Sequence, residues 1–110
     1  MKYDVTIILR KHINELFQIL GKHNIADKAE LITVAKNDIE FKKAVLMCVG
    51  YIGELSKKMD NDVKLSKPDV NWRRLEKSRN IIFHDYDIVS MTVITDVIFG
   101  DITMLREILG

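Results

Sequence analysis

Residues 39–59 read IEFKKAVLMCVGYIGELSKKM, and their apolar side chains recur at steps of three and four residues. That period is typical of an amphipathic helix, and Asn37 or Asp38 is placed to cap its amino end. Gly50 and Gly53 lie inside the pattern, where a glycine costs about 1 kcal/mol relative to alanine. We therefore expect the two glycines to allow close contact between this helix and another.

The segments on either side of this helix are less uniform. Residues 4–20 repeat the helical period and predict a long helix, with Gly21 as its stop signal. Residues 25–36 carry a weaker apolar pattern that predicts a short helix. Residues 60–68 are polar, end on the only proline of the chain and predict a loop.

The last third of the chain predicts two further helices. Asn71 is placed to cap a helix that runs to about Tyr86, and residues 88–109 predict another. Residues 92–99 are β-branched and form a rival strand pattern, but a lone strand would have no sheet to join. No internal repeat or linker divides residues 1–110. The expected fold is a single all-α domain, a bundle of four or five helices.

The composition limits the partners and the compartment. Hydrophobic residues make up 47% of the 110 residues, enough for a core, and the formal net charge is +1. This charge gives no general attraction to nucleic acid or to an anionic membrane, so any polyanion site must be a local patch. The first residues lack a signal-peptide core, and no segment approaches about 20 apolar residues. Together with the single, unpaired cysteine, this leads us to expect a cytoplasmic protein without membrane contact. Because that cysteine, Cys48, lies in an apolar run, we expect its thiol to be buried and inert.

The helix predicted over residues 71–86 carries an arginine on its apolar face. At 3.6 residues per turn, Arg79 falls in the middle of a stripe that also contains Trp72, Leu75, Ile82, Phe83 and Tyr86. A guanidinium in such a place needs a carboxylate or an anion, because burying its charge unpaired costs several kcal/mol. Glu54, on the helix predicted over residues 39–59, is the expected partner.

A basic, hydrogen-bonding edge runs beside that stripe and consists of Arg73, Lys77, Asn80 and His84. Arg79 and His84 are about 140° apart around an ideal helix, so one helix alone brings them together poorly. They can meet on a ligand if the helix unwinds near Asp85, or if a two-fold axis brings a second copy alongside. The plain alternative is a structural ion pair for Arg79 and a half-exposed surface histidine at His84.

The other histidines and the methionines predict no site. His12, at the edge of an apolar stripe, and His23, in a turn, are expected to be structural or surface residues. The sequence contains no metal-ligand spacing and no glycine-rich phosphate loop, so no metal or cofactor is expected. Four methionines are expected to fill the core: Met47, Met59, Met91 and Met104.

Residues 79–86, RNIIFHDY, resemble the Arg-x4-His-x-Tyr motif of the HEPN superfamily, in its HepT-like toxin branch. Residues 51–54, YIGE, are similar to the Ile-Gly-Glu segment of that branch. The spacing from residues 70–72 to the arginine resembles its Pro-Trp to Arg-Asn spacing, with Asn71 in place of the usual proline. The resemblance covers roughly residues 40–110, and the residues that flank the arginine and the histidine make it specific.

This resemblance implies an all-α, HEPN-like homodimer that cleaves RNA without metal, as the toxin of a type II toxin–antitoxin pair. The family's catalytic arginine and histidine correspond to Arg79 and His84, and the polar residue after the arginine corresponds to Asn80. The implied antitoxin is an MNT-type nucleotidyltransferase that attaches AMP to the motif tyrosine, which here is Tyr86.

The chemistry of these residues suits that function. Metal-independent RNA cleavage needs a base near the 2′-hydroxyl, an acid near the leaving oxygen and a cation beside the phosphorane, which histidine and arginine provide. Glu54, Arg73 and Lys77 are expected to support the site, and Tyr86 is expected in a solvent-accessible turn. Two other functions stay open: a non-catalytic helical module that binds and regulates a small nucleotidyltransferase, and a bundle with only a structural or interaction role.

Overall fold

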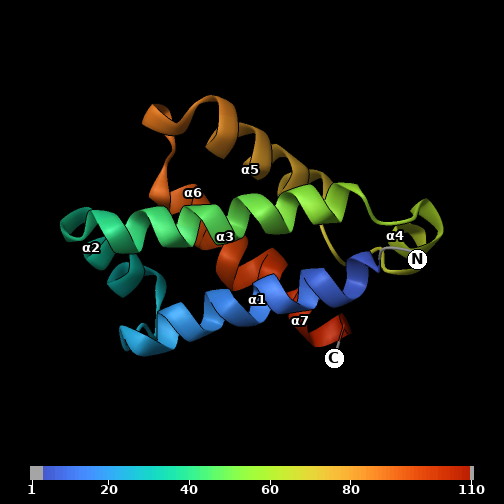
Figure 1. Ribbon diagram of the computed structural model, residues 1–110, viewed down its shortest axis with the longest axis horizontal. Helices are drawn as coiled ribbons and strands as arrows, with labels where there is room; N and C mark the ends of the chain where they lie inside the picture. Colours follow the sequence, from blue (N-terminus) through green and yellow to red (C-terminus); the bar gives the residue numbers. More distant parts are fainter. Residues whose placement is uncertain (1–3, 110) are drawn as a thin grey trace.

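The computed structural model describes residues 4–109, and the regular structure in that range is helical throughout (Figure 1). In chain order the elements are α1 (Val5–Lys22), α2 (Lys28–Asn37), α3 (Ile39–Lys57), α4 (Asn61–Ser66), α5 (Trp72–His84), the 3₁₀ turn η1 (Tyr86–Ile88), α6 (Met91–Asp96), the π-helical segment η2 (Val97–Ile102) and α7 (Thr103–Leu109). The last three elements follow one another without a break and form one C-terminal helix. The prediction of an all-α bundle is confirmed.

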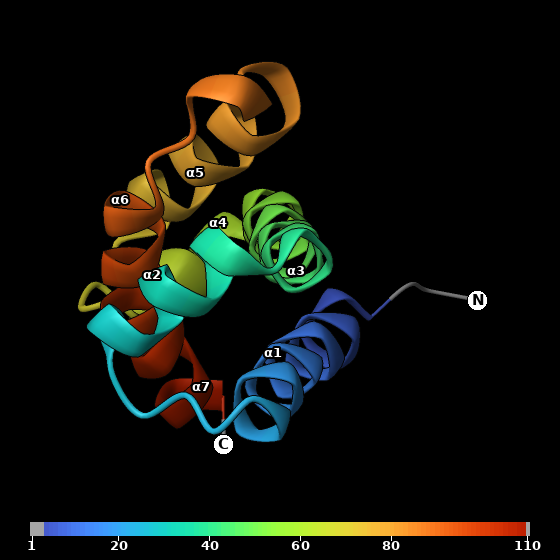
Figure 2. The ribbon, with the colours of Figure 1, turned by 90° about the vertical axis from the view of Figure 1, so that its left-hand side faces the viewer.

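Helix α3 lies at the centre of the bundle. It packs against α1 on one side and against α5 on the other (Figure 1). The view turned by 90° shows α6 and α7 on the side of α3 where α2 and α5 also lie (Figure 2), and the C-terminal helix packs against α1, α2 and α5. These helices enclose one apolar core, whose largest fully buried side chains are Leu9, Ile13, Leu16, Leu31, Val45, Leu46, Ile52, Leu75, Ile94, Ile98, Ile102 and Leu105.

Side-chain caps fix where the main helices begin. Asp38 accepts a hydrogen bond from the Phe41 amide at 3.1 Å, and Asn71 accepts one from the Arg74 amide at 3.0 Å, so both predicted caps are present. The predicted end of α1 is wrong, because the helix continues through Gly21 to Lys22. Asn24, whose φ of 57° is left-handed, turns the chain after this helix.

The structure also differs from the predictions for residues 60–68 and for the helix predicted over residues 71–86. Residues 60–68 are not all loop, because α4 forms within them; Lys64 Nζ in that helix contacts Glu76 Oε1 on α5 at 3.3 Å. No residue of this short helix is fully buried, so the sequence carries no apolar period that would predict it. The helix that begins at Trp72 ends at His84, and the turn η1 separates it from the C-terminal helix.

The β-branched residues 92–99 are helical, so the rival strand prediction is wrong. Their helix widens into π geometry over η2, where the Thr103 hydroxyl donates to the Ile98 carbonyl at 2.9 Å. Arg74 Nε donates to Asp101 Oδ2 at 2.5 Å, which ties α5 to this wide turn. The C-terminal helix is therefore held by burial and by an ion pair, which together override its weak helix propensity.

The predictions for methionines and cysteine have mixed outcomes. Met59 is buried, as expected, whereas Met47 is half-exposed and Met104 is also exposed, so the core assignment of those two is wrong. Cys48 is buried as predicted. Burial and the nearby negative charge of Glu15 raise the pKa of its thiol to about 11, which keeps the thiol protonated and unreactive.

The two glycines of α3 permit the close approach of α5, as predicted. A Cβ built on Gly53 would lie 2.5 Å from the Leu75 carbonyl oxygen and 2.7 Å from the Arg79 Cβ. A Cβ on Gly50 would lie 2.7 Å from the Phe83 ring. The Gly53 contact is the stricter one, because a backbone carbonyl cannot rotate out of the way as a side chain can.

We predict that Gly53→Ala lowers the free energy of unfolding by about 1–3 kcal/mol, because the clash with α5 outweighs the gain in helix propensity. The matched control is Gly21→Ala, since a Cβ at that helical position meets nothing within 4 Å. The control should be neutral or stabilising by up to about 1 kcal/mol. Urea unfolding at one fixed protein concentration measures both. Equal stability of the two variants would contradict the packing argument.

Candidate active site

Helices α3 and α5 bring Arg79 and Glu54 together. Arg79 Nε donates to Glu54 Oε2 at 2.6 Å, and each side chain is about a quarter exposed, at 23% and 25%. The predicted partner of the arginine is therefore confirmed. Glu54 also lies 3.8 Å from Lys58 Nζ, one helical turn further along α3. The carboxylate thus sits between two cations at the edge of the core.

Two further contacts orient the guanidinium. Arg79 Nη1 donates to Asn80 Oδ1 at 2.9 Å, and the guanidinium carbon lies 5.3 Å from the centre of the Phe83 ring. Arginine has five N–H donors, so donors remain on the outer edge of the group after these two bonds. An arginine fixed in this way can offer a preorganised fork to a phosphate.

His84 is the last residue of α5, and its side chain is exposed. The Asp85 amide donates to the Ile81 carbonyl at 2.9 Å, so the helix is regular up to His84 and does not unwind before it. The structure therefore keeps Arg79 and His84 about 140° apart around the helix. The helix does end near Asp85, as one of the two proposed routes requires, but His84 itself stays helical, so the helix end does not bring the two side chains together within one chain.

The basic edge of α5 is exposed as predicted. Arg73, Lys77, Asn80 and His84 all face solvent. Within residues 4–109, no carboxylate forms an ion pair with Arg73 or Lys77. These two cations are available to an anionic ligand that lies along the helix.

Tyr86 differs from its prediction. Its hydroxyl is buried and has no hydrogen-bond partner within the described residues, so the expected solvent-accessible hydroxyl is wrong. The turn η1 folds back toward α3, where Lys42 Nζ lies 5.8 Å from the centre of the tyrosine ring. In this conformation the hydroxyl is not accessible to a partner enzyme.

A group of partly exposed aromatic residues lies beside the arginine and was not predicted. Tyr51 stacks on His12 with ring centres 5.3 Å apart and meets Phe83 edge-on at 6.3 Å. Met47, one turn before Tyr51 on α3, is half-exposed. We call His12, Met47, Tyr51 and Phe83 the aromatic patch. The sequence placed Phe83 and Met47 in the core, and only the three-dimensional packing leaves them on one exposed surface.

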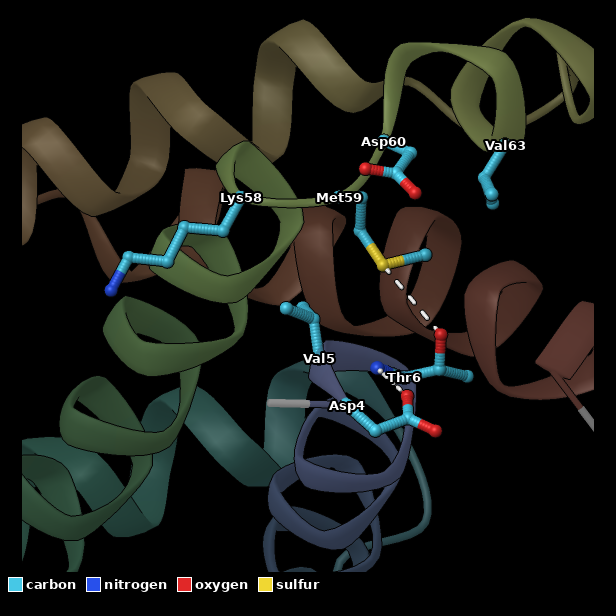
Figure 3. Close-up of a pocket in the computed structure, with 7 residues that line it drawn as sticks. All are labelled: Asp4, Val5, Thr6, Lys58, Met59, Asp60 and Val63. Atoms are coloured by element: carbon cyan, nitrogen blue, oxygen red, sulfur yellow. Dashed lines mark hydrogen bonds between the residues drawn. The ribbon is translucent and has the colours of Figure 1, made fainter. Parts of the chain in front are cut away.

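A hollow of about 370 Å³ lies elsewhere, where the amino end of α1 meets the end of α3 (Figure 3). In Figure 3, Asp4 caps α1 through a bond of 3.0 Å from the Thr6 amide, and the Thr6 hydroxyl points to Met59 Sδ at 3.9 Å. Neither Arg79 nor His84 is among the residues that line it. This hollow is therefore a junction between helix ends, separate from the motif.

Other features of the described residues bear on the site. In residues 4–109, no group of three or more histidine, cysteine or carboxylate side chains is placed to hold a metal ion. His23 bonds through Nδ1 to the Ile19 carbonyl at 3.0 Å, a structural role as expected. None of the helices between residues 4 and 109 combines the length and the apolar character that crossing a membrane requires.

The chain is similar to proteins that carry a ribonuclease name. A curated protein of Thermococcus cleftensis, named "Probable ribonuclease HepT", is 30% identical over 92 residues, which cover 76% of this chain and 84% of that protein. A protein of Methanocaldococcus jannaschii, named "Putative RNase MJ1380", is 25% identical over 71 residues, which cover 64% of this chain and 65% of that protein. No solved structure matches the chain.

The family model described as "Ribonuclease HepT-like" matches residues 22–110. This range contains the helices that position Glu54, Arg79 and His84. The match agrees with the HEPN-type motif at residues 79–86 and with the all-helical fold. The chain belongs to the HepT-like ribonuclease family of HEPN proteins.

Proposed function

We propose that Arg79, Asn80 and His84 carry the endoribonuclease activity of this family in the present chain, without a metal ion. The observation that supports this most directly is the fixed orientation of the Arg79 guanidinium. Glu54 and Asn80 hold it in one orientation while donors remain for a phosphate. The exposed His84 follows on the same helix.

The residues suggest a transphosphorylation. A neutral imidazole of His84 takes the proton of the RNA 2′-hydroxyl, and the 2′-oxygen attacks the adjacent phosphorus. The P–O5′ bond breaks, and a protonated imidazole gives its proton to the departing 5′-oxygen. The products are a 2′,3′-cyclic phosphate and a 5′-hydroxyl. Arg79 stabilises the charge of the phosphorane, and Asn80 keeps the arginine in place.

This scheme requires two imidazoles, one as base and one as acid, or a single imidazole that performs both steps. A homodimer would supply the second imidazole. Because α5 stays regular through His84, one protomer does not bring His84 onto the same side of the helix as Arg79. The aromatic patch lies next to Arg79. Phe83 belongs to this patch, and its ring also lies against the Arg79 guanidinium. We propose that two copies meet through this patch and that their Arg79 and His84 side chains face a shared cleft.

The toxin assignment adds a partner. We propose that the chain is the toxin of a type II pair and that an MNT-type nucleotidyltransferase attaches AMP to Tyr86. The phosphodiester and adenosine would then occupy the end of α5 beside His84 and repel an RNA phosphate. Because the Tyr86 hydroxyl is buried, η1 must open before transfer.

We predict that RNA cleavage persists in EDTA and that His84→Ala lowers it about a hundredfold or more, since general acid–base catalysis contributes on that scale. His84 is exposed, so its variant should melt like the wild-type protein. His23→Ala serves as the histidine control. Gel assays and mass analysis of the cyclic phosphate measure the outcome. Loss of activity on chelation, or full activity of His84→Ala, would contradict the catalytic assignment.

For the dimer, we predict that Met47→Glu gives a monomer with little cleavage activity, because two carboxylates would be placed in one apolar interface. Met104→Glu is a matched control, since that methionine is exposed on α7 outside the aromatic patch. Sedimentation velocity at micromolar concentration reports the mass of each variant. A wild-type protein that is monomeric and still cleaves RNA would refute the shared cleft.

For regulation, incubation with a purified partner nucleotidyltransferase and ATP should add AMP to the peptide that contains Tyr86. Lys42→Ala removes the ammonium group over the tyrosine ring and should speed transfer roughly two- to fivefold by easing the opening of η1. Lys43→Ala, an exposed neighbour, is the control. Modification only at other residues would contradict this proposal. So would a Tyr86→Phe variant whose RNA cleavage is still inhibited by the catalytic activity of the partner.

A further inference from the structure

We propose that the apolar hollow between α4 and the start of α5 binds one base of a single-stranded RNA substrate, at the far end of the basic edge from His84. This inference rests on the proposed ribonuclease function and names how its substrate is held. It adds a contact beyond the catalytic motif.

The hollow has the character of a base-stacking site. It measures about 460 Å³ and is lined by Asn61, Lys64, Leu65, Pro68 and Trp72. Trp72 Nε1 donates to the Lys67 carbonyl at 3.2 Å, which fixes the indole against the chain that precedes α5. Leu65 lines the hollow and is 77% exposed, so its apolar side chain is accessible to a ligand there.

The charges around the hollow suit a base there and phosphates beyond it. Lys64, the one cation in the lining, contacts Glu76 Oε1 at 3.3 Å and is mostly covered, so its charge is compensated. Asp62 and Asp69 are exposed nearby but do not line the hollow. A neutral aromatic ring fits this composition better than a phosphate does.

The basic edge joins the hollow to the motif. Arg73 follows Trp72 directly, and Lys77 lies one turn further toward His84. Both cations are exposed without an ion pair in residues 4–109. A strand with its phosphates along these residues would have one end at the hollow and the other at the catalytic histidine. This continuity favours RNA over a protein as the occupant.

The distance between the hollow and His84 along α5 fits a short oligonucleotide. Trp72 and His84 are the first and last residues of α5, and twelve steps at 1.5 Å separate them by about 18 Å. At the stacked spacing of one strand, this corresponds to about five nucleotides. Stacking on an aromatic ring accepts any base, so the site adds affinity and a minimum length without strict sequence preference.

The test uses the fluorescence of Trp72, the only tryptophan in the chain. His84→Ala protein, which should bind without cleaving, is titrated with a single-stranded 12-residue oligouridylate and, separately, with the dinucleotide UpU. A 3′-fluorescein label on the 12-mer reports total binding by anisotropy. We expect the 12-mer to quench Trp72 and UpU at the same concentration to leave it unchanged.

Variants identify the contact. In the same background, Leu65→Glu should weaken binding of the 12-mer about five- to hundredfold, the scale of losing one stacked base. Ile7→Glu makes the same change of charge at another exposed apolar residue, away from the hollow, and should leave binding unchanged. Because Leu65 is largely exposed, its variant should remain folded, and a melting curve checks this.

The remaining outcomes separate this inference from the proposed function. Binding of the 12-mer without quenching of Trp72, or with unchanged affinity in Leu65→Glu, overturns the base site and leaves the ribonuclease proposal intact. No binding of RNA by any form overturns both. If Leu65→Glu instead abolishes binding of a purified nucleotidyltransferase while RNA binding is unchanged, the hollow is a protein-docking surface and the inference is wrong.

Discussion

The close approach of α3 and α5 at Gly53 positions the candidate site. With no Cβ at this residue, the Leu75 carbonyl and the Arg79 Cβ come within 2.7 Å of the place a methyl group would fill. The next residue of α3 is Glu54, whose carboxylate reaches Arg79 Nε as a result. A backbone contact therefore sets the geometry of the ion pair. One turn earlier, Gly50 makes the matching space for the Phe83 ring.

The Glu54–Arg79 pair is better understood as a positioning device than as a source of stability. Both side chains are about a quarter exposed, and pairs at such positions contribute little net free energy because desolvation offsets attraction. What the pair does is restrict the guanidinium to one orientation, together with Asn80 and the Phe83 ring. Preorganisation of this kind matters for stabilising charge that develops on a phosphate.

The residues that were predictable from sequence are those that obey the helical period. The period placed Arg79 on an apolar face and so required a partner such as Glu54, and the two glycines indicated a close helix contact. Two features could not be read from it. Helix α4 has no fully buried residue, and η1 is a single 3₁₀ turn that buries the Tyr86 hydroxyl. Neither leaves a repeating apolar pattern in the sequence, so the helical period could not predict them.

The two sides of α5 therefore differ in how much freedom they have. The side toward α3 is fixed by backbone contact, and the neighbouring basic edge, from Arg73 to His84, is open to ligands. At its end the chain turns through η1, which buries the Tyr86 hydroxyl. No residue of η1 is fully buried, and segments with few buried contacts open most easily. If AMP transfer and RNA binding both use this end of α5, they compete for one edge of one helix. AMP on Tyr86, attached after this short turn opens, would then switch the protein with no rearrangement of its core.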